Sequence, residues 1–236
     1  SSEKIFRSAV QNHQKNDLRA AQELYDKVLK IDPTHVDAHS NLGVIFQNFG
    51  DTQKAISCYE KAIEINPSHT NSYYNLGVVY QGLGDAQKAI SYNEKVIELN
   101  AEYADAYTNL GVLFQSLGES KKAISFYEKA IEINPNHVNS HSNLGIVFSE
   151  LNDFQNAKKC YEKAIKINPN HVDSYNNLGV VFQSLGDEQN AISSYEKALK
   201  LNPNFFFAQE NIANIFIGKF DNEKNAISAS HKALKM

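Results

Sequence analysis

Apolar residues recur along this chain at helical spacing. Between Val36 and His69 they fall mostly three or four positions apart, which is the pattern of helices that pack on one side. The pattern predicts one helix over about 35–49 and a second over about 52–65, which we call the A helix and the B helix. The apolar positions are Leu42, Ile45, Phe46, Phe49, Ala55, Ile56, Tyr59, Ala62, Ile63 and Ile65.

A short turn separates the two predicted helices at Gly50 and Asp51. Glycine can adopt the left-handed conformation that ends a helix, and aspartate can accept hydrogen bonds from the first N–H groups of the next helix. The B helix is expected to end at Asn66, because the residue before Pro67 is pushed out of helical geometry. Thr34 is expected to cap the A helix. The segment is therefore predicted to be a helix–turn–helix unit.

This unit recurs with a period of 34 residues, which the tripeptide Asn-Leu-Gly marks at five places. A fixed period of this size indicates units that bury their apolar faces only by stacking on one another. The sequence therefore predicts a single all-α repeat array over residues 1–236, without a separate domain. The repeats are expected at about 2–35, 36–69, 70–103, 104–137, 138–171, 172–205 and 206–236, the last divergent and incomplete.

Some copies depart from the pattern. Asn93 replaces the core tyrosine of the B helix, Ala101 replaces the proline, and Asn152 replaces the glycine of the turn. These changes are expected to loosen the packing locally without changing the architecture. The last copy is expected to form its own B helix, which would include Ala226 and Ile227.

The 34-residue unit resembles the tetratricopeptide repeat along essentially the whole chain. The resemblance implies an all-α, right-handed superhelical solenoid of antiparallel helix pairs, with A helices lining a concave groove and B helices facing outward. The residues at the matching positions of the unit are Leu42, Gly43, Phe46, Ala55, Tyr59, Ala62 and Pro67.

One face of the A helices is the candidate binding surface. Asp37, Asn41 and Val44 lie at i, i+4 and i+7, and so share a face opposite Leu42 and Phe46. An asparagine amide both donates and accepts, so a series of them can bind the backbone of an extended polypeptide. Such a groove would be partly apolar and mildly acidic, which suits neutral or basic chains. The candidate peptide-binding residues are Asn41, Asn75, Asn109, Asn143, Asn177 and Asn211, with Asp37, Asp105, Asp173, Val44, Val78 and Val112 beside them.

The asparagine series, with its accompanying aspartates, resembles the repeat arm of O-linked N-acetylglucosamine transferases. The segment Asp37-Ala38-His39-Ser40-Asn41-Leu42 is close to the repeat sequence typical of that family. The resemblance implies an arm that recruits a substrate or partner, and it implies no catalysis, because the transferase domain is absent from these residues. The chain is accordingly expected to be part of a longer protein.

Two alternatives remain open. The asparagines can be remnants of a recent duplication, copied together with the rest of each repeat. The protein can also be a structural scaffold that self-associates through its convex face or its chain ends. Against simple copying, the last repeat changes the neighbouring Leu-Gly to Ile212-Ala213 yet keeps Asn211.

Composition narrows the class of partner and the compartment. The 236 residues have a formal net charge of −4 and a pI of about 6.1, without the basic surface that nucleic-acid phosphates require. No apolar stretch approaches the roughly 20 residues of a membrane span. Cys58 and Cys160 occupy one repeat position three copies apart, too far apart for a disulfide. We therefore expect a cytoplasmic protein that binds neither nucleic acid nor membrane.

The sequence predicts no enzyme, cofactor or metal site. His35 and His39, like His137 and His141, are i, i+4 pairs that could face one metal ion, but no third ligand is evident. The favoured interpretation is that one histidine at the start of the A helix has been copied. Serine-nucleophile motifs, glycine-rich phosphate loops and paired-cysteine motifs are absent from the sequence.

Overall fold

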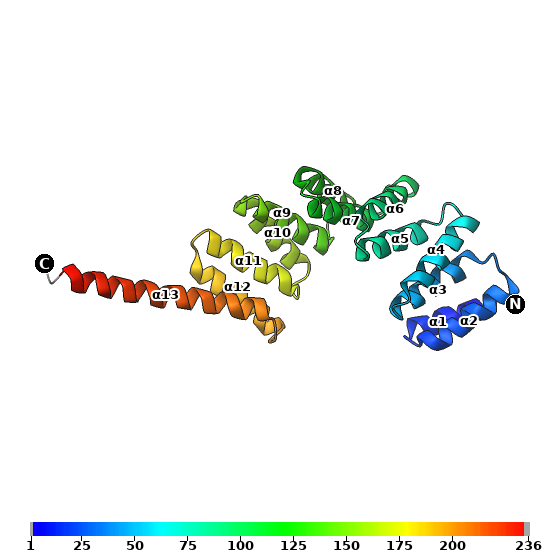
Figure 1. The fold of residues 1–236 in the computed structure, drawn as a ribbon, viewed down its shortest axis with the longest axis horizontal. Helices are drawn as coiled ribbons and strands as arrows, with labels where there is room; N and C mark the ends of the chain where they lie inside the picture. The colour runs from blue at the N-terminus through cyan, green and yellow to red at the C-terminus, as the bar shows by residue number, and fades with distance from the viewer. Residues whose placement is uncertain (1, 234–236) are drawn as a thin grey trace. The chain divides into compact units, whose positions relative to one another are not determined.

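The computed structural model describes residues 2–233, with side chains described for 2–219 and 224, and within these residues it contains α-helices and no strand. None of the described helices is both long and apolar enough to cross a membrane. The all-α fold expected from the periodicity is confirmed. The helices in Figure 1 are α1 Ser2–Gln14, α2 Leu18–Ile31, α3 Val36–Asn48, α4 Thr52–Ile65, α5 Thr70–Gly82, α6 Ala86–Leu99, α7 Ala104–Ser116, α8 Ser120–Ile133, α9 Val138–Glu150, α10 Phe154–Ile167, α11 Val172–Ser184, α12 Glu188–Leu201 and α13 Phe206–Ala233.

The chain forms two compact units, Ser1–Glu119 and Ser120–Met236. In the first unit, the helix pairs α1/α2, α3/α4 and α5/α6 stack in chain order, and α7 packs against α6. In the second unit, α8 packs against α9, the pairs α9/α10 and α11/α12 stack on each other, and α13 packs against α12. Each odd-numbered helix from α1 to α11 is an A helix, and its even-numbered neighbour is the B helix of the same repeat.

The turns between A and B helices follow the sequence expectation. Gly50 has a φ of 76°, in the left-handed region that favours glycine, and the Asp51 side chain accepts a hydrogen bond from the Lys54 backbone N–H at 3.2 Å. Asn152 adopts the same conformation, with a φ of 59°. The substitution therefore keeps the turn, because asparagine tolerates the left-handed region better than most residues.

The cap of the A helix differs from the expected one. His35, and not Thr34, is the N-cap, because its Nδ1 accepts a hydrogen bond from the Ala38 N–H at 3.3 Å. The Thr34 hydroxyl instead donates to Asp32 at 2.8 Å, within the loop that precedes the helix. His171 caps α11 in the same way. The copied histidines thus have a structural role at the helix start.

The core of each pair is built around a buried tyrosine of the B helix. The Tyr59 ring lies against Gly43, where an added Cβ would come within 2.6 Å of ring atom Cε1. This contact explains why a glycine recurs in the middle of the A helices despite its low helix propensity. The fully buried tyrosines at this position are Tyr25, Tyr59, Tyr127, Tyr161 and Tyr195.

In the third repeat, the smaller Asn93 fills the position of this tyrosine. It is fully buried, and its Nδ2 donates to the Ala89 carbonyl oxygen at 2.8 Å. Nearby, the Tyr80 and Tyr92 rings stack with centroids 5.5 Å apart. The helix pair keeps its architecture because a hydrogen bond satisfies the buried amide and other aromatic rings fill the layer.

The last repeat differs from the expected helix pair. Residues 206–233 form one continuous helix, α13, and no turn divides it (Figure 1). Lys219 and Phe220 stand where the preceding repeat has Leu185 and Gly186. Without the glycine, the left-handed turn is unfavourable, and the helix continues past the position where the other A helices end.

Candidate functional site

The three sets of candidate residues lie in the same order on successive A helices. All six asparagines of the series are half-buried. The aspartates one turn earlier, Asp37, Asp105 and Asp173, are exposed, and the valines one turn later, Val44, Val78 and Val112, are half-buried. Along this face, the polar side chains therefore come first and an apolar side chain follows about two turns later.

In the second unit, this face encloses a hollow of about 290 Å³ between α9 and α11. The hollow brings together the predicted residues Asn143, Asn177 and Asp173. It also includes Ser142 and His171, which the sequence pattern did not assign to a binding site. Its full lining is Asn139, Ser142, Asn143, Ile146, His171, Asp173 and Asn177.

A chain of short contacts fixes the wall of the hollow. His171 Nδ1 accepts from the Ser174 N–H at 3.3 Å and lies 2.8 Å from the Ser174 hydroxyl. That hydroxyl lies 3.3 Å from the hydroxyl of Ser142 in the preceding A helix. Because these contacts link α9 to α11, the hollow is held open by polar packing between repeats.

The asparagines differ in how much of their hydrogen-bonding capacity the protein itself uses. Asn109 Nδ2 donates to Asn93 at 3.4 Å, and Asn211 Nδ2 donates to Asn176 at 3.2 Å. Asn75 and Asn143 make no side-chain hydrogen bond to any described residue. The half-buried amides of Asn75 and Asn143 therefore have both a donor and an acceptor available to bind a ligand.

The carboxylates on this face also differ. Asp37 Oδ1 lies 3.2 Å from His69 Nε2 of the next repeat. The position that corresponds to His69 after Asp173 is Phe205, which has no polar side chain. Among the described side chains, Asp173 therefore has no hydrogen-bonding or ionic partner, and it adds negative potential to the hollow.

In the first unit, the equivalent place between α3 and α5 keeps the polar contacts, since the Ser72 hydroxyl lies 3.2 Å from that of Ser40 and 2.9 Å from His69 Nδ1. The equivalent place between α5 and α7 is instead filled by aromatic rings. Tyr74 and Tyr103 stand at the positions of Ser142 and His171, and their ring centroids lie 5.1 Å apart. Burial raises the pKa of both hydroxyls, and the charge of Asp105 adds to the rise. The face thus has a tyrosine pair between α5 and α7, whereas the other two places carry serine and histidine contacts. A pairwise comparison of the copies could have found both.

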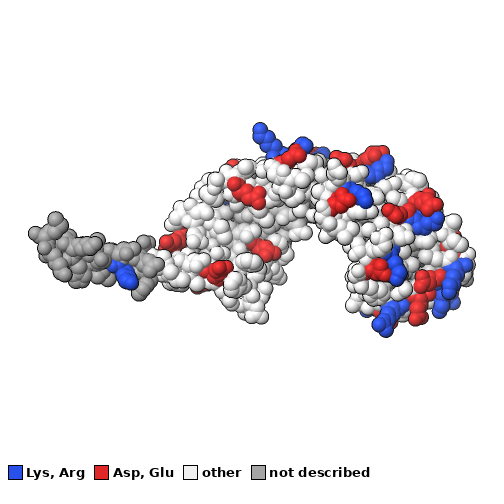
Figure 2. All heavy atoms as spheres, viewed as in Figure 1, with Lys and Arg blue, Asp and Glu red and all other residues white. Residues whose placement is uncertain are grey.

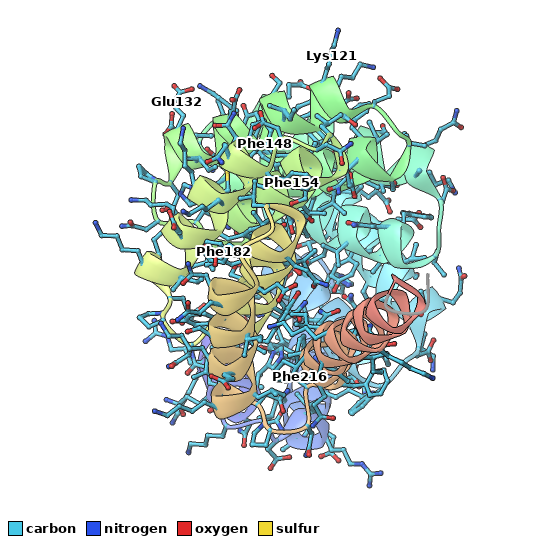
Figure 3. All side chains as sticks on the ribbon, turned by 90° about the vertical axis from the view of Figure 1, so that its left-hand side faces the viewer. Lys121, Glu132, Phe148, Phe154, Phe182 and Phe216 are labelled. Carbon is cyan, nitrogen blue, oxygen red and sulfur yellow. The ribbon has the colours of Figure 1, made fainter. Side chains whose placement is uncertain are left out.

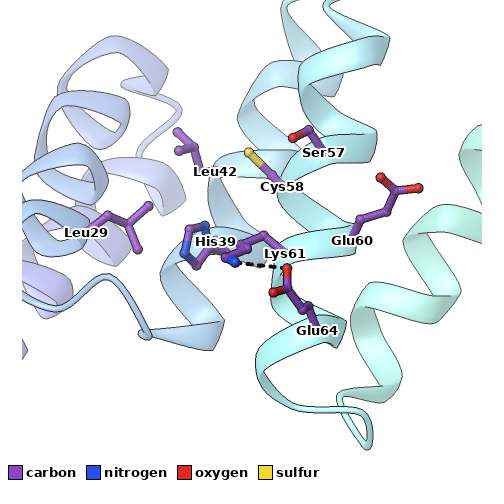
Figure 4. Close-up of a pocket in the computed structure, with 8 residues that line it drawn as sticks. All are labelled: Leu29, His39, Leu42, Ser57, Cys58, Glu60, Lys61 and Glu64. Carbon is purple, nitrogen blue, oxygen red and sulfur yellow. Dashed lines mark hydrogen bonds and ion pairs between the residues drawn. The ribbon is translucent and has the colours of Figure 1, made fainter.

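A second kind of hollow lies between consecutive B helices, away from the predicted residues. One of about 410 Å³, shown in Figure 4, is lined by residues of α2, α3 and α4. A hollow of about 340 Å³ recurs one repeat later, so it follows from the stacking itself. Burial raises the pKa of the Cys58 thiol in the first hollow to about 11, so this cysteine is not a nucleophile at neutral pH. The lining of the first is Leu29, His39, Leu42, Ser57, Cys58, Glu60, Lys61 and Glu64.

Basic and acidic side chains alternate on the B helices. Lys61 pairs with Glu64 at 2.9 Å, and Lys95 pairs with Glu98 at 2.7 Å. On the face of the first unit in Figure 2, blue and red atoms accordingly lie next to one another. Among the described residues, no group of three or more histidines, cysteines and carboxylates is placed to hold a metal ion.

Family models match most of the chain. A model described as tetratricopeptide repeat matches residues 34–102, 70–136 and 102–170, and a second of that description matches 172–205. A model described as TPR repeat matches residues 12–50. No protein of curated function matches the sequence.

Solved structures share the fold. MamA is 26% identical, with a TM-score of 0.61 over 71% of this chain and 92% of MamA. PilF of Pseudomonas aeruginosa is 20% identical, with a TM-score of 0.80 over 90% of this chain and 97% of PilF. YrrB, described as a TPR protein with an unusual peptide-binding site, is 22% identical, with a TM-score of 0.61 over 79% of this chain and 96% of YrrB. At these identities, PilF and YrrB show similarity of fold alone.

Proposed function

The chain belongs to the tetratricopeptide-repeat family, whose members generally mediate interactions between proteins, and we propose that it binds an extended polypeptide along its A-helix face. The observation that supports this most is the state of Asn75 and Asn143. Both amides are half-buried on the predicted face, and neither is used by the described part of the protein. The family is typically a non-catalytic interaction module, and we assign the chain no reaction.

The repeat geometry suits recognition of a peptide backbone. Helices in contact lie about 10 Å apart, and an extended chain advances about 3.4 Å per residue. Each asparagine would therefore meet roughly every third peptide unit. An amide that donates to a carbonyl and accepts from an N–H binds the backbone whatever the side chain, so the series would accept many sequences.

Charge would restrict those sequences to neutral or basic ones. The aspartates beside the asparagines are exposed, and Asp173 has no partner among the described side chains. An acidic peptide would be repelled at the three layers that carry Asp37, Asp105 and Asp173, whereas a neutral or basic one would not. The peptide-binding site named for YrrB supports the choice of a peptide ligand on this fold. We propose that the array recruits such a partner as part of a larger protein.

A peptide array tests the proposal. The intact protein is compared with a variant in which Asn75, Asn109, Asn143 and Asn177 are all changed to alanine. If each lost contact weakens binding by about 1 kcal/mol, the four changes weaken it by about two to three orders of magnitude. The helical content and melting temperature are measured in parallel to show that the fold is retained.

A matched control changes three exposed loop asparagines that lie outside the A-helix face, namely Asn136, Asn170 and Asn204. This variant should bind as the intact protein does. If the four-site variant also binds like the intact protein, with an unchanged melting temperature, the asparagines recur only because the repeats were duplicated. The proposal is then wrong.

A further inference from the structure

An apolar face of α13 is left uncovered. Phe216 is 56% exposed and Ile217 is 59% exposed, although the A-helix aromatic at the position of Phe216 is only 9% exposed in Tyr80. In the preceding repeat, Phe182 packs against the cluster that includes Tyr195 of its own B helix. Figure 3 shows Phe182 and Phe148 on their helices together with Phe216 on α13. What Phe216 lacks is the B helix that would cover it.

The sequence of a B helix is nevertheless present. Residues 225–235 match residues 190–200 of α12 at eight of eleven positions, including Asn-Ala-Ile-Ser at the start and Lys-Ala-Leu-Lys at the end. In the structure, residues 225–233 lie in the continuation of α13 and do not fold back on its first half. The covering segment is thus held away from the face in its own chain.

The cause lies in the connection between the two halves of α13. The corresponding turn in the sixth repeat uses Gly186 with a φ of 78°, whereas the last repeat has Phe220. A left-handed conformation costs a residue with a side chain roughly 1–2 kcal/mol. The repeat is also one residue longer here, 35 from Asn190 to Asn225. In addition, Lys219 pairs with Glu188 of α12 at 2.8 Å, at the point where a turn would begin.

The segment also matches the α13 face in particular. In the sixth repeat, a Cβ on Gly179 would come within 2.5 Å of the Tyr195 ring, and the Tyr195 hydroxyl donates to Gln183. In the last repeat, all three positions change together: Ala213 replaces the glycine, Ser230 replaces the tyrosine and Ile217 replaces the glutamine. The larger residue on the A helix accompanies the smaller residue on the B segment, a change that favours complementary packing, although the first repeat combines Ala9 with the full tyrosine ring of Tyr25.

We infer that two copies of this chain exchange residues 222–233, so that this segment of each copy covers Phe216 and Ile217 of the other. The exchange rebuilds, between two chains, the helix pair that other repeats form within one chain. It forms a two-fold interface in which each surface meets itself, which is a low-cost route to a dimer. This inference goes beyond peptide binding, and it does not involve the asparagine series.

Sedimentation of the full chain gives the first test. The mass should be that of two chains. Changing Lys219→Leu and Phe220→Gly and deleting Asn222 restores the turn of the other repeats, and should halve the mass with the helical content unchanged. The matched control Phe220→Ala keeps the cost of a left-handed residue with a side chain, as well as Lys219 and the extra residue, and should remain dimeric. A monomeric intact chain, or a restored-turn variant that stays dimeric, overturns the inference.

A cross-linking experiment separates exchange from other contacts. Both native cysteines are changed to alanine, and I217C and S230C are introduced into separate preparations, at positions equivalent to the Gln183–Tyr195 pair. When the two preparations are unfolded, mixed and refolded, a short bis-maleimide should join one chain of each. A second variant carries both I217C and S230C in one chain. If its cross-link forms only within one chain, the segment folds back on its own α13, which would contradict the exchange. Absence of any cross-link, or species larger than two chains, would contradict it as well.

Discussion

The ring of Tyr195 lies so close to Gly179 that a Cβ on the glycine would come within 2.5 Å of ring atom Cε1. The same relationship joins Tyr59 to Gly43 and Tyr161 to Gly145. The distance between the A and B helices is thus set by one glycine and one aromatic ring. This contact fixes the A helix, and the face it exposes, against the B helix of the same repeat.

Gly179→Ala should therefore destabilise the protein by about 1–3 kcal/mol, because the added methyl overpacks the pair. Equilibrium unfolding in urea measures the change. The control is Gly82→Ala at the end of α5, where an added Cβ meets nothing within 4 Å. That variant should be more stable by up to about 1 kcal/mol, because alanine favours the helix. Equal effects of the two substitutions would exclude the packing explanation.

The first repeat has Ala9 where the next five repeats have glycine, and the hydroxyl of its tyrosine has a different environment. Tyr25 is fully buried, and its hydroxyl is the buried side-chain polar atom without a hydrogen bond among the described residues. Burial raises the pKa of Tyr25; the nearby Asn41 amide opposes this rise, but it does not lie in hydrogen-bonding geometry with the hydroxyl.

Tyr25→Phe should consequently be neutral or stabilise the protein by up to about 2 kcal/mol, because it removes an unsatisfied buried group. Tyr195→Phe should instead destabilise it by about 1 kcal/mol, because it removes the 3.0 Å hydrogen bond to Gln183. The two free energies of unfolding are compared under identical conditions. Destabilisation by Tyr25→Phe equal to that of Tyr195→Phe would show that the Tyr25 hydroxyl is satisfied.

The turn at Asn152 offers a stabilising substitution. Its φ of 59° is in the left-handed region, where four equivalent residues, such as Gly186, are glycines and that of the first repeat is Asn16. Asn152→Gly should raise the free energy of unfolding by a few tenths to about 1 kcal/mol, and Asn152→Ala should lower it. Thermal unfolding followed by circular dichroism ranks the three proteins. Alanine matching or exceeding glycine would show that the turn imposes no left-handed constraint.

The buried imidazole of His141 should make stability depend on pH. Burial lowers its pKa below the usual value, so the folded state binds fewer protons than the unfolded state. Stability should fall as the pH drops through about 6.5, where the unfolded histidine becomes protonated, and the loss should level off below the folded-state pKa.

His141→Gln isolates this contribution. His141 Nε2 lies 3.0 Å from the Pro135 carbonyl oxygen, and in the last repeat Gln209 donates to the Pro203 carbonyl oxygen at 2.8 Å. Glutamine can thus keep the contact without titrating. The drop in melting temperature between about pH 8 and pH 5 should be smaller in the variant. It should not vanish, because burial lowers the pKa of His13 as well. An identical drop in both proteins would show that His141 does not contribute to the pH dependence of stability.

Most of the fold could be predicted from the sequence, because the period places equivalent residues in equivalent surroundings. The B helix predicted over about 52–65 is α4, and the turn at Gly50 has the expected conformation. The predicted N-cap was wrong. Thr34 and His35 can both accept a hydrogen bond from the helix start, but the Thr34 hydroxyl donates to Asp32 and His35 accepts from the Ala38 N–H. The continuous α13 was missed, because residues 225–235 keep the sequence of a B helix while Phe220 removes the turn.

The candidate site could be predicted only in part. Helical spacing placed the asparagines on one face, and the structure brings Asn143, Asn177 and Asp173 to one hollow. Spacing within one helix could not show that Ser142 and His171 complete this hollow, since their contact with Ser174 joins two repeats. It also could not show which amides the protein itself uses, because those hydrogen bonds depend on neighbouring copies.

The central claim is that a free amide of the asparagine series binds the backbone of a peptide, and a double-mutant cycle at Asn143 tests it most directly. The best-binding peptide from the array is made with each amide in turn replaced by an ester, and its affinity is measured for the intact protein and for Asn143→Ala. One ester should weaken binding to the intact protein about tenfold and weaken binding to the variant no further. If every ester weakens binding to both proteins equally, Asn143 does not contact the peptide backbone and the account is contradicted.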